Sequence, residues 1–379
     1  MRILFICGSL EPGQDGVGDY TRRLAGECVR NGHKVFVMAL HDKFIKKSEN
    51  YSRSIEGQAD FDGTLINTIR ISASTLWVER SHYLRNLTEK FEPDWTSVQY
   101  VPYAYQKHGL PFRFVMQAFS DTISRIHLMA HELWETENTV QSIAKGFLQK
   151  QLIRHFQKKH KIPKIHTTVK DYREKIRDAG LHGSILPLFG NIPVTPLEVL
   201  GKLSPGEQLT GGLQALYFGT APKPQVQLNI SDGLNEVLRK GNVNLNLRLA
   251  GRLGDFGKKF VECLESKTGC FVKINVTGPL SGNELSKLMH SSHFGISRSP
   301  GKFIGKSGSA ISMLEHGLPL WLPAHQAEPV PNEDLALFPQ AMISNNIREV
   351  IDHNLRPSPR SVLPEVYRML LDDLTTNQN

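Results

Sequence analysis

Short apolar runs alternate with amphipathic helical patterns from one end of this 379-residue chain to the other. This alternation predicts parallel β-sheets with helices on both faces, because consecutive parallel strands must be joined by a crossover, usually a helix. In the first half of the chain, strands are expected at residues 2–7, 34–39, 64–71, 95–100, 125–130 and 164–168. In the second half, they are expected at 214–219, 244–250, 271–276, 293–297 and 318–322.

The pattern breaks once, over residues 187–210, where Pro and Gly are frequent and no periodicity is visible. We interpret this segment as a linker between an N-terminal domain at 1–195 and a C-terminal domain at 211–355. Residues 356–379 are expected to form a helix and tail that pack back on the N-terminal domain. Each domain is predicted to be an α/β, Rossmann-like, doubly wound sheet. The two should face each other across a cleft at the carboxyl ends of their strands, where such sheets bind ligands.

Charge and cysteine content narrow the functional classes. Lys and Arg exceed Asp and Glu by 45 to 37, which favours an anionic partner such as phosphate, an acidic membrane surface or nucleic acid. No apolar stretch approaches the roughly 20 residues that span a bilayer, and the N-terminal MRILFICGSL resembles a buried strand more than a signal peptide. The four cysteines, which fit a reducing, cytoplasmic compartment and show no zinc-binding spacing, are Cys7, Cys28, Cys263 and Cys270.

A glycine-rich loop follows the first predicted strand and precedes the first predicted helix. Gly13, Gly16 and Gly18 would let backbone amides approach a phosphate at the positive end of that helix. The spacing is not GxGxxG, and Ala39 and Leu40 stand where a dinucleotide-binding domain would place an acidic residue. An ordinary strand-to-helix loop is the alternative interpretation.

A second glycine-containing segment, SRSPGKFIGKSGSAISMLEHGLPLW, spans residues 297–321. It contains the GKS of a P-loop, but Pro300 stands where the first P-loop glycine should be, so the spacing excludes that motif. A strand, a loop with two lysines and small residues opening a helix still predict an anion site at Lys306, Ser307 and Gly308. Glu315, on the same helix, is expected to accept hydrogen bonds from a ribose diol. The alternative is a capped helix with a surface Glu.

Two further features have both a functional and a structural interpretation. His131 directly follows the predicted strand at 125–130, so it should lie at a carboxyl end as a candidate catalytic group, although a lone His is often structural. Residues 150–164 carry six Lys or Arg and two His among apolar positions. This segment is expected either to rest on an acidic membrane surface or to be a solvated helix with a buried apolar stripe.

Taken together, these segments resemble the retaining glycosyltransferases of GT-B fold, in particular family 4. The stretch from RILFICGSL to HKVFV is similar to that family's opening strand, glycine loop, first helix and second strand. FEPDWTSVQY, HELW and HTTVKDYREKI resemble segments that follow in the same order. The resemblance covers nearly the whole chain, and the glycine loop, HELW and EHGLPLW together carry it.

The resemblance implies roles for particular residues. Gly16 and Gly18 would border the donor diphosphate or the acceptor, and His131 would contact the donor sugar near the reacting carbon. Glu315 matches the second Glu of the family's E-x7-E motif, which binds the nucleotide ribose. Ser307 occupies the place of the first Glu.

The phosphate-binding pair of the family is also replaced. Where the family has Gly-Arg after the first strand of the C-terminal domain, this chain has Gly219 and Thr220. Arg252 follows the next strand instead and, together with Lys306, would meet the charge of the donor phosphates.

The activity implied by the resemblance is transfer of a sugar from a nucleotide-activated donor to a hydroxyl of a glycan or lipid-linked acceptor. Such transfer would be retaining and metal-independent, would need no cofactor or nucleic acid, and would serve polysaccharide biosynthesis in the cytoplasm or at the inner face of the membrane. Two alternatives remain open. One is a GT-B fold nucleotide-sugar epimerase, and the other is a non-catalytic relative that binds a sugar nucleotide or a partner protein.

Overall fold

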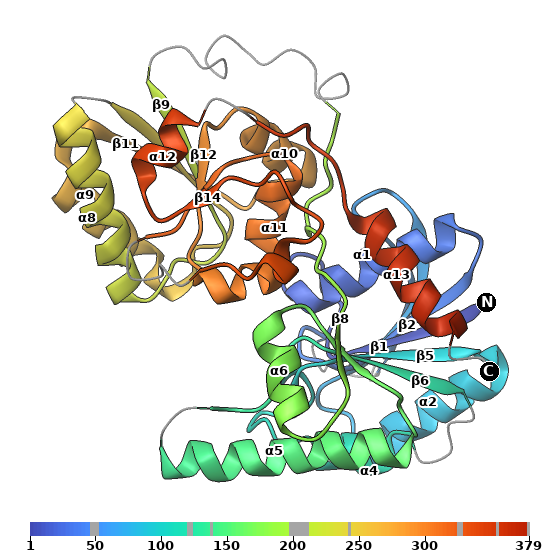
Figure 1. The fold of residues 1–379 in the computed structure, drawn as a ribbon. Helices are drawn as coiled ribbons and strands as arrows, with labels where there is room; N and C mark the ends of the chain where they lie inside the picture. Colours follow the sequence, from blue (N-terminus) through green and yellow to red (C-terminus); the bar gives the residue numbers. More distant parts are fainter. Residues whose placement is uncertain are drawn as a thin grey trace. The chain divides into compact units, whose positions relative to one another are not determined.

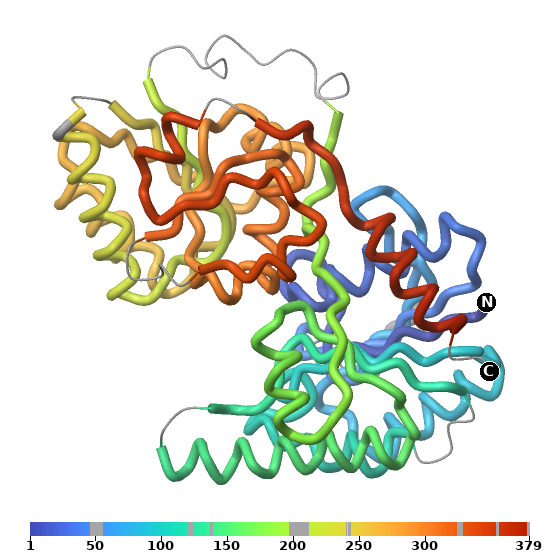
Figure 2. Tube along the Cα trace, in the orientation of Figure 1, coloured from blue at the N-terminus to red at the C-terminus, as the bar shows by residue number. Residues whose placement is uncertain are grey.

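The computed structural model describes residues 1–45, 53–119, 124–136, 139–196, 212–241, 244–323, 329–353 and 356–376. The chain forms two compact units, and each is described by itself. Unit 1 consists of Met1–Pro187 and Leu363–Asn379, and unit 2 of Leu188–Val362. Figure 2 traces the chain in colours that follow the residue number. Unit 1 therefore contains both the first and the last part of the chain.

Unit 1 is built on a sheet in the order β3-β4-β2-β1-β5-β6-β7-β8. Its strands are β1 (Arg2–Cys7), β2 (Lys34–Asp42), β3 (Arg53–Ala59), β4 (Leu65–Ser72), β5 (Trp95–Tyr100), β6 (Arg125–Ala130), β7 (Ile165–Thr167) and β8 (Gly183–Ile185). All neighbours are parallel except β3, which pairs antiparallel with β4 at the edge. The strand order reverses between β1 and β5, and the carboxyl ends of these strands mark the place where doubly wound sheets bind ligands.

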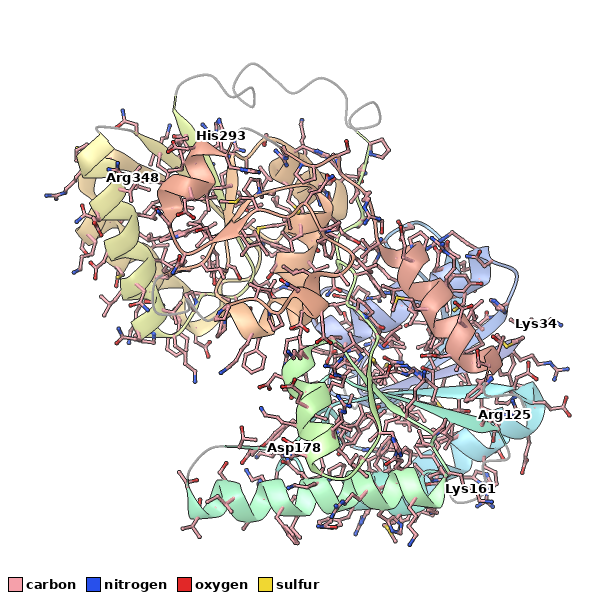
Figure 3. The ribbon with its side chains drawn as sticks, in the orientation of Figure 1. Lys34, Arg125, Lys161, Asp178, His293 and Arg348 are labelled. Carbon is pink, nitrogen blue, oxygen red and sulfur yellow. The ribbon has the colours of Figure 1, made fainter. Side chains whose placement is uncertain are left out.

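Helices cover both faces of this sheet, as the alternating sequence predicts. Unit 1 contains α1 (Gly16–Arg30), α2 (Trp77–Phe91), α3 (Pro102–Tyr105), α4 (Phe112–Gln117), α5 (Val140–Lys159), α6 (Lys170–Asp178) and α13 (Leu363–Thr376). In Figure 1, α1 and α13 lie on one face, and α2, α4 and α5 on the other. Lys34 and Arg125, labelled in Figure 3, begin β2 and β6 and mark the amino-terminal edge, opposite the candidate ligand edge.

Unit 2 contains a sheet of parallel strands in the order β11-β10-β9-β12-β13-β14. The strands are β9 (Leu213–Phe218), β10 (Leu245–Ala250), β11 (Val272–Gly278), β12 (Phe294–Ile296), β13 (Leu320–Trp321) and β14 (Ile343–Ser344). The helices are α8 (Pro224–Gly241), α9 (Gly257–Thr268), α10 (Gly282–His290), α11 (Gly308–Glu315) and α12 (Ile347–Asp352), with a 3-10 helix, η3, at Gly301–Lys306. The switch point of this sheet lies between β9 and β12.

The boundaries between the units differ from those expected. The sequence predicts that residues 188–195 belong to the N-terminal domain, but they belong to unit 2. There, the Ile192 amide donates a hydrogen bond of 3.2 Å to Ser312 Oγ. Residues 356–362 also belong to unit 2, because the Arg356 guanidinium donates to the backbone carbonyls of residues 289, 290, 292 and 316. Most of the expected linker, residues 197–210, lies outside the described residues.

Candidate functional site

The switch point of unit 2 brings a glycine loop against the first turn of α11. Gly219 directly follows strand β9, and its φ of +124° lies in a region that side chains disfavour. A Cβ built at Gly219 would lie 3.9 Å from Ser309 Oγ, so the loop passes close to the helix. The neighbouring loop after β10 also approaches, since a Cβ at Gly251 would lie 3.4 Å from the Gly219 nitrogen. Glycine at both positions therefore lets these two loops and the start of α11 approach one another closely.

The amino terminus of α11 has the geometry of an anion site. Ser307 caps the helix, and its Oγ accepts a hydrogen bond of 3.4 Å from the Ala310 amide. In the part of the chain that the structure describes, no hydrogen-bond partner accepts from the amides of Gly308 and Ser309. Helix amides of this kind, at the positive end of the helix dipole, are suited to bind phosphate.

Cationic side chains surround this helix terminus. Lys306 and Lys302 are both half-buried, and their ammonium nitrogens lie 5.7 and 5.4 Å from the centre of the Phe303 ring. Arg298 follows β12, is exposed and donates a hydrogen bond of 3.4 Å to the Thr220 carbonyl. Arg298 is not among the residues expected from the sequence, although its position directly after a buried strand is the signal that could have identified it.

Arg252 reaches the same edge of the sheet from the other side of β9. It is exposed and follows Gly251, at the end of β10, the strand that pairs with β9 in register. The expected cations Lys306 and Arg252 therefore come from loops that flank the same glycine, although their strands are different.

The amino terminus of α1 differs in charge from that of α11. Asp15 caps α1, and its Oδ1 accepts hydrogen bonds of 3.0 and 2.9 Å from the Val17 and Gly18 amides. A carboxylate already occupies these amides and repels a second anion. Gly18 is buried against the backbone of Ser9, so closely that a Cβ there would collide with the Ser9 carbonyl oxygen. The diphosphate contact expected at Gly18 is therefore replaced by close packing, while Gly16 is exposed at the first position of the helix.

His131 lies where the sequence predicts, immediately after the carboxyl end of β6. Its amide donates to the Tyr100 carbonyl at 3.0 Å, and its ring meets the Tyr20 ring edge-on at 4.8 Å between centres. Its Nε2 forms a hydrogen bond of 2.8 Å with Gln99 Oε1, and 8% of the residue is exposed. The ring is therefore held from two sides at the ligand edge of unit 1.

Glu315 is in a different environment from the one expected. The residue is 1% exposed, and its Oε1 accepts hydrogen bonds of 2.8 Å from the Val362 amide and 3.3 Å from Ser361 Oγ. It also stands in the last turn of α11, roughly 10 Å along the helix from the anion site. A ribose cannot reach a carboxylate that the chain itself covers, so the burial of Glu315 argues against the expected ribose contact. Its side chain instead holds residues 361 and 362, where the chain leaves unit 2.

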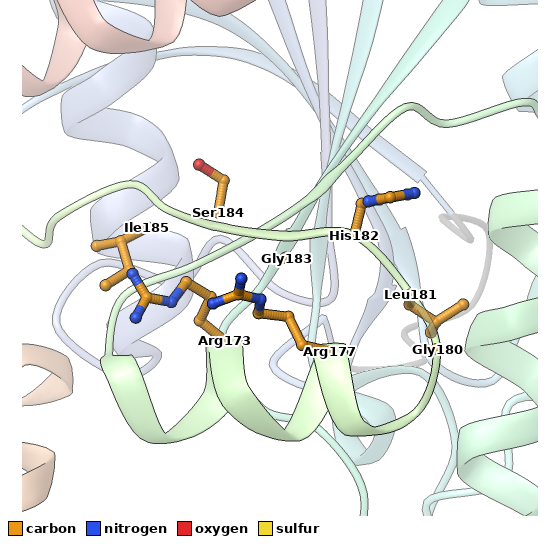
Figure 4. A pocket seen from close by; sticks show the side chains of 8 residues that line it. All are labelled: Arg173, Arg177, Gly180, Leu181, His182, Gly183, Ser184 and Ile185. Carbon is orange, nitrogen blue, oxygen red and sulfur yellow. The ribbon is translucent and has the colours of Figure 1, made fainter.

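A cationic cavity of about 690 Å³ lies against α6 and β8 in unit 1 (Figure 4). Arg173 and Arg177 extend from one face of α6 toward the strand. The remaining lining residues are Gly180, Leu181, His182, Gly183, Ser184 and Ile185. None of the residues singled out from the sequence lines this cavity, which makes Arg177 a useful control for charge effects at the α11 site.

The basic segment 150–164 belongs mainly to α5 and divides into two parts. Leu152, Ile153 and Phe156 are buried in the core of unit 1, as the alternative of a buried stripe predicts. The preceding turns of the helix instead expose apolar side chains, with exposed fractions of 84% at Val140, 60% at Ile143 and 57% at Phe147. No acidic residue occurs within α5.

The cysteines, possible metal ligands and possible membrane-spanning helices are further candidate functional features. Burial raises the pKa of Cys7 and of Cys28, so both thiols are protonated and unreactive at neutral pH. Over the described ranges, no group of three His, Cys, Asp or Glu side chains is arranged to hold a metal ion. Among those same residues, no helix is both long and apolar enough to cross a membrane.

Comparisons with known proteins identify the class of fold. No protein-family model and no curated protein sequence matches this chain. Solved structures do match. Sucrose-phosphate synthase from Thermosynechococcus elongatus has a TM-score of 0.64 at 12% identity, over 99% of this chain and 94% of that one. A glycosyltransferase from Rickettsia africae has a TM-score of 0.54 at 12% identity, over 99% and 96%.

An epimerase matches over a similar length. UDP-GlcNAc 2-epimerase from Neisseria meningitidis, solved bound to UDP-GlcNAc, has a TM-score of 0.54 at 12% identity, over 99% of this chain and 100% of that one. Two doubly wound parallel sheets and these neighbours define the GT-B fold, so the predicted fold class is confirmed. At 9–12% identity the likeness establishes the fold and leaves the activity to the site.

Proposed function

We propose that this chain is a glycosyltransferase that moves a sugar from a nucleotide-activated donor to a hydroxyl of a glycan or lipid-linked acceptor. The observation that carries the proposal is the amino terminus of α11, where the amides of Gly308 and Ser309 lie beside Lys306 at a switch point. The contrast with the acid-capped α1 favours α11 as the phosphate site. The fold shared with a glycosyltransferase and a sucrose-phosphate synthase supports the same class of reaction.

The proposed site stabilises the leaving group. As the bond between sugar and diphosphate breaks, negative charge grows on the diphosphate oxygens. Preorganised amides and cations aimed at those oxygens stabilise the transition state more than the ground state. Lys306, Arg252 and Arg298 would supply the positive charge that a divalent ion supplies elsewhere, so we expect transfer without a metal. In this proposal His131 acts on the sugar near the reacting carbon, with retention of configuration, as the family resemblance implies.

Incubation with UDP-, GDP-, ADP- and dTDP-sugars, each with an acceptor mixture and EDTA, tests the proposal. We expect one donor to release its nucleoside diphosphate while its sugar appears on the acceptor. The epimerase alternative, favoured by the match to UDP-GlcNAc 2-epimerase, predicts an isomerised sugar without an acceptor. Binding of a sugar nucleotide with neither product would indicate a non-catalytic relative. No binding of any donor would contradict the transferase and the epimerase and leave only a relative that binds a partner protein.

We further propose that α5 rests on an acidic membrane surface from which a lipid-linked acceptor is taken. Val140, Ile143 and Phe147 are exposed at the helical spacing of one face, and α5 carries cations but no acid. Exposed apolar and basic side chains on one helix are typical of interfacial binding to anionic lipids. Vesicle flotation should show binding that needs phosphatidylglycerol and that Phe147→Glu abolishes. Equal binding by this variant would contradict the assignment.

A further inference from the structure

Buried polar side chains form a continuous hydrogen-bonded chain through unit 1, beginning at His131. Its Nε2 is 2.8 Å from Gln99 Oε1, and Gln99 Nε2 is 2.8 Å from Ser97 Oγ. Ser97 Oγ is in turn 2.8 Å from Nδ1 of His127. Ser97, Gln99 and His127 are each at most 4% exposed, so water does not replace these contacts.

The second half of this polar chain leads from the sheet to the C-terminal helix. His127 Nε2 is 2.8 Å from His166 Nδ1, and His166 Nε2 is 2.6 Å from Asp373 Oδ2 on α13. Lys164 forms an ion pair with the other carboxylate oxygen of Asp373. Six side chains from β5, β6, β7, α13 and the loop after β6 thus connect the ligand edge of unit 1 to its last helix.

Parallel pairing explains why these residues meet. Ser97 on β5 is in register with His127 on β6, and Ser97 and Gln99 lie two residues apart on one face of the strand. On the other side of β6, Met129 is in register with His166 on β7. Adjacent polar positions on one face of three neighbouring strands therefore bring the side chains into a single row.

The carboxylate at the far end fixes the direction of every hydrogen bond. Burial alone would raise the pKa of Asp373, but hydrogen bonds from His166 and Lys164 lower it to about 2, so the group is ionised and can only accept. His166 must therefore donate from Nε2, and in the neutral ring its Nδ1 then accepts a hydrogen bond from His127 Nε2. Burial, with the neighbouring His166 ring, also holds the pKa of His127 well below its usual value, so His127 is neutral and has one donor and one acceptor nitrogen.

The same logic extends to His131. The acceptor nitrogen of His127 is Nδ1, so the Ser97 hydroxyl must donate a hydrogen bond to it. Ser97 Oγ then accepts a hydrogen bond from the Gln99 amide nitrogen. The Gln99 oxygen then faces His131 and accepts from Nε2. We propose that this chain of hydrogen bonds is a positioning device, in which Asp373 and Gln99 hold the proton of His131 on Nε2 and the lone pair on Nδ1.

The consequence for the reaction rests on the proposed function. A ring with one fixed tautomer presents the same nitrogen to the donor sugar in every encounter, and the opposite tautomer would present an N–H where an acceptor is needed. Asp373 and Gln99 would then act through His131 and contact no substrate themselves.

Nitrogen-15 NMR of histidine-labelled full-length protein tests the device without reference to activity. In the wild type, His131, His127 and His166 should each show the signature of the Nε2–H tautomer at neutral pH. In Asp373→Asn, the Lys164 ammonium can accept no hydrogen bond, so the amide oxygen must face it. The amide nitrogen then faces His166 Nε2 and donates to it, which reverses the direction of that hydrogen bond. We expect the Nε2–H population of His131 to fall from nearly complete to less than half.

Two controls make the result decisive. Asp372→Asn alters the exposed neighbouring carboxylate on α13 and should leave all three tautomers unchanged. Gln99→Leu removes only the last link, so His131 should lose its single tautomer while His127 and His166 keep theirs. If His131 carries its proton on Nδ1 in the wild type, or keeps Nε2–H when His166 has reversed, the proposal is overturned.

Turnover of the same variants separates the device from the proposed function. If His131 acts on the sugar, Asp373→Asn should lower kcat by about 10-fold or more with little change in the donor KM. A reversed tautomer with unchanged turnover would leave the positioning device established and contradict the role of His131 in the reaction.

Discussion

Replacement of Glu315 distinguishes its observed structural role from the ribose contact that its position in the sequence suggests. In Glu315→Ala, the buried Val362 amide loses its acceptor, which costs about 1–3 kcal/mol. Removal of the buried Cγ methylene adds about 0.8 kcal/mol. The total of about 2–4 kcal/mol corresponds to a fall in melting temperature of roughly 5–15 °C for a domain the size of unit 2.

Glu315→Gln is the matched variant, because its amide keeps an oxygen opposite the Val362 amide. We expect it to recover most of the lost stability in differential scanning calorimetry. Neither variant should change the dissociation constant of a nucleoside diphosphate by more than about twofold in titration calorimetry at a temperature where both are folded. A tenfold weaker affinity in Glu315→Gln, at an unchanged melting temperature, would refute this reasoning and restore the ribose contact.

Three other predictions concern charge, catalysis and pH. Lys306→Ala should weaken binding of a nucleoside diphosphate by about 10- to 100-fold in titration calorimetry, because a charge-assisted hydrogen bond is lost, and should spare the free nucleoside. Arg177→Ala, which removes a cation from the α6 cavity, is the control and should leave this affinity unchanged. If Arg177→Ala weakens diphosphate binding and Lys306→Ala does not, the phosphate site is not at α11. His131→Ala should reduce kcat far more than it raises the donor KM in steady-state assays, whereas a packing role would lower only the melting temperature. Burial, together with the neighbouring His166 ring, lowers the pKa of His127 in the folded chain. Below about pH 6.5, unfolding therefore takes up a proton at this residue. As the pH falls through this range, the free energy of unfolding should decrease by up to about 1.4 kcal/mol per pH unit. Urea titrations between pH 7 and 5 should show a smaller fall in His127→Gln.

The central strands could be predicted from the sequence because they are buried on both faces and therefore form continuous apolar runs. All eleven expected strands are present, with ends that differ by at most three residues. The strand β3, RSIEGQA, was missed because an edge strand paired on one side needs no apolar run. The strands β8 and β14, with three and two residues, are too short to produce a pattern.

The site was only partly predictable. Small residues and a lysine after a buried strand were enough to place a candidate anion site at the amino terminus of α11, because such a site depends on local backbone geometry. The role of Glu315 could not be predicted from spacing, since α11 is buried over most of its surface and the Glu315 carboxylate bonds to Ser361 and Val362, which lie far along the chain. The hydrogen-bonded chain behind His131 joins residues as far as 207 positions apart, which no local pattern can show.

The backbone amides of Gly308 and Ser309 provide the most direct test of the proposed donor site. In a TROSY spectrum of the full-length, deuterated protein, titration with UDP, GDP, ADP and dTDP should shift these two resonances with at least one nucleotide. The matching nucleoside without phosphates should leave them in place. We expect saturable shifts of Gly308 and Ser309, and we expect Lys306→Ala to weaken them. Shifts confined to Val17 and Gly18 at the start of α1, or no shift with any of the four nucleotides, would contradict the proposed donor site.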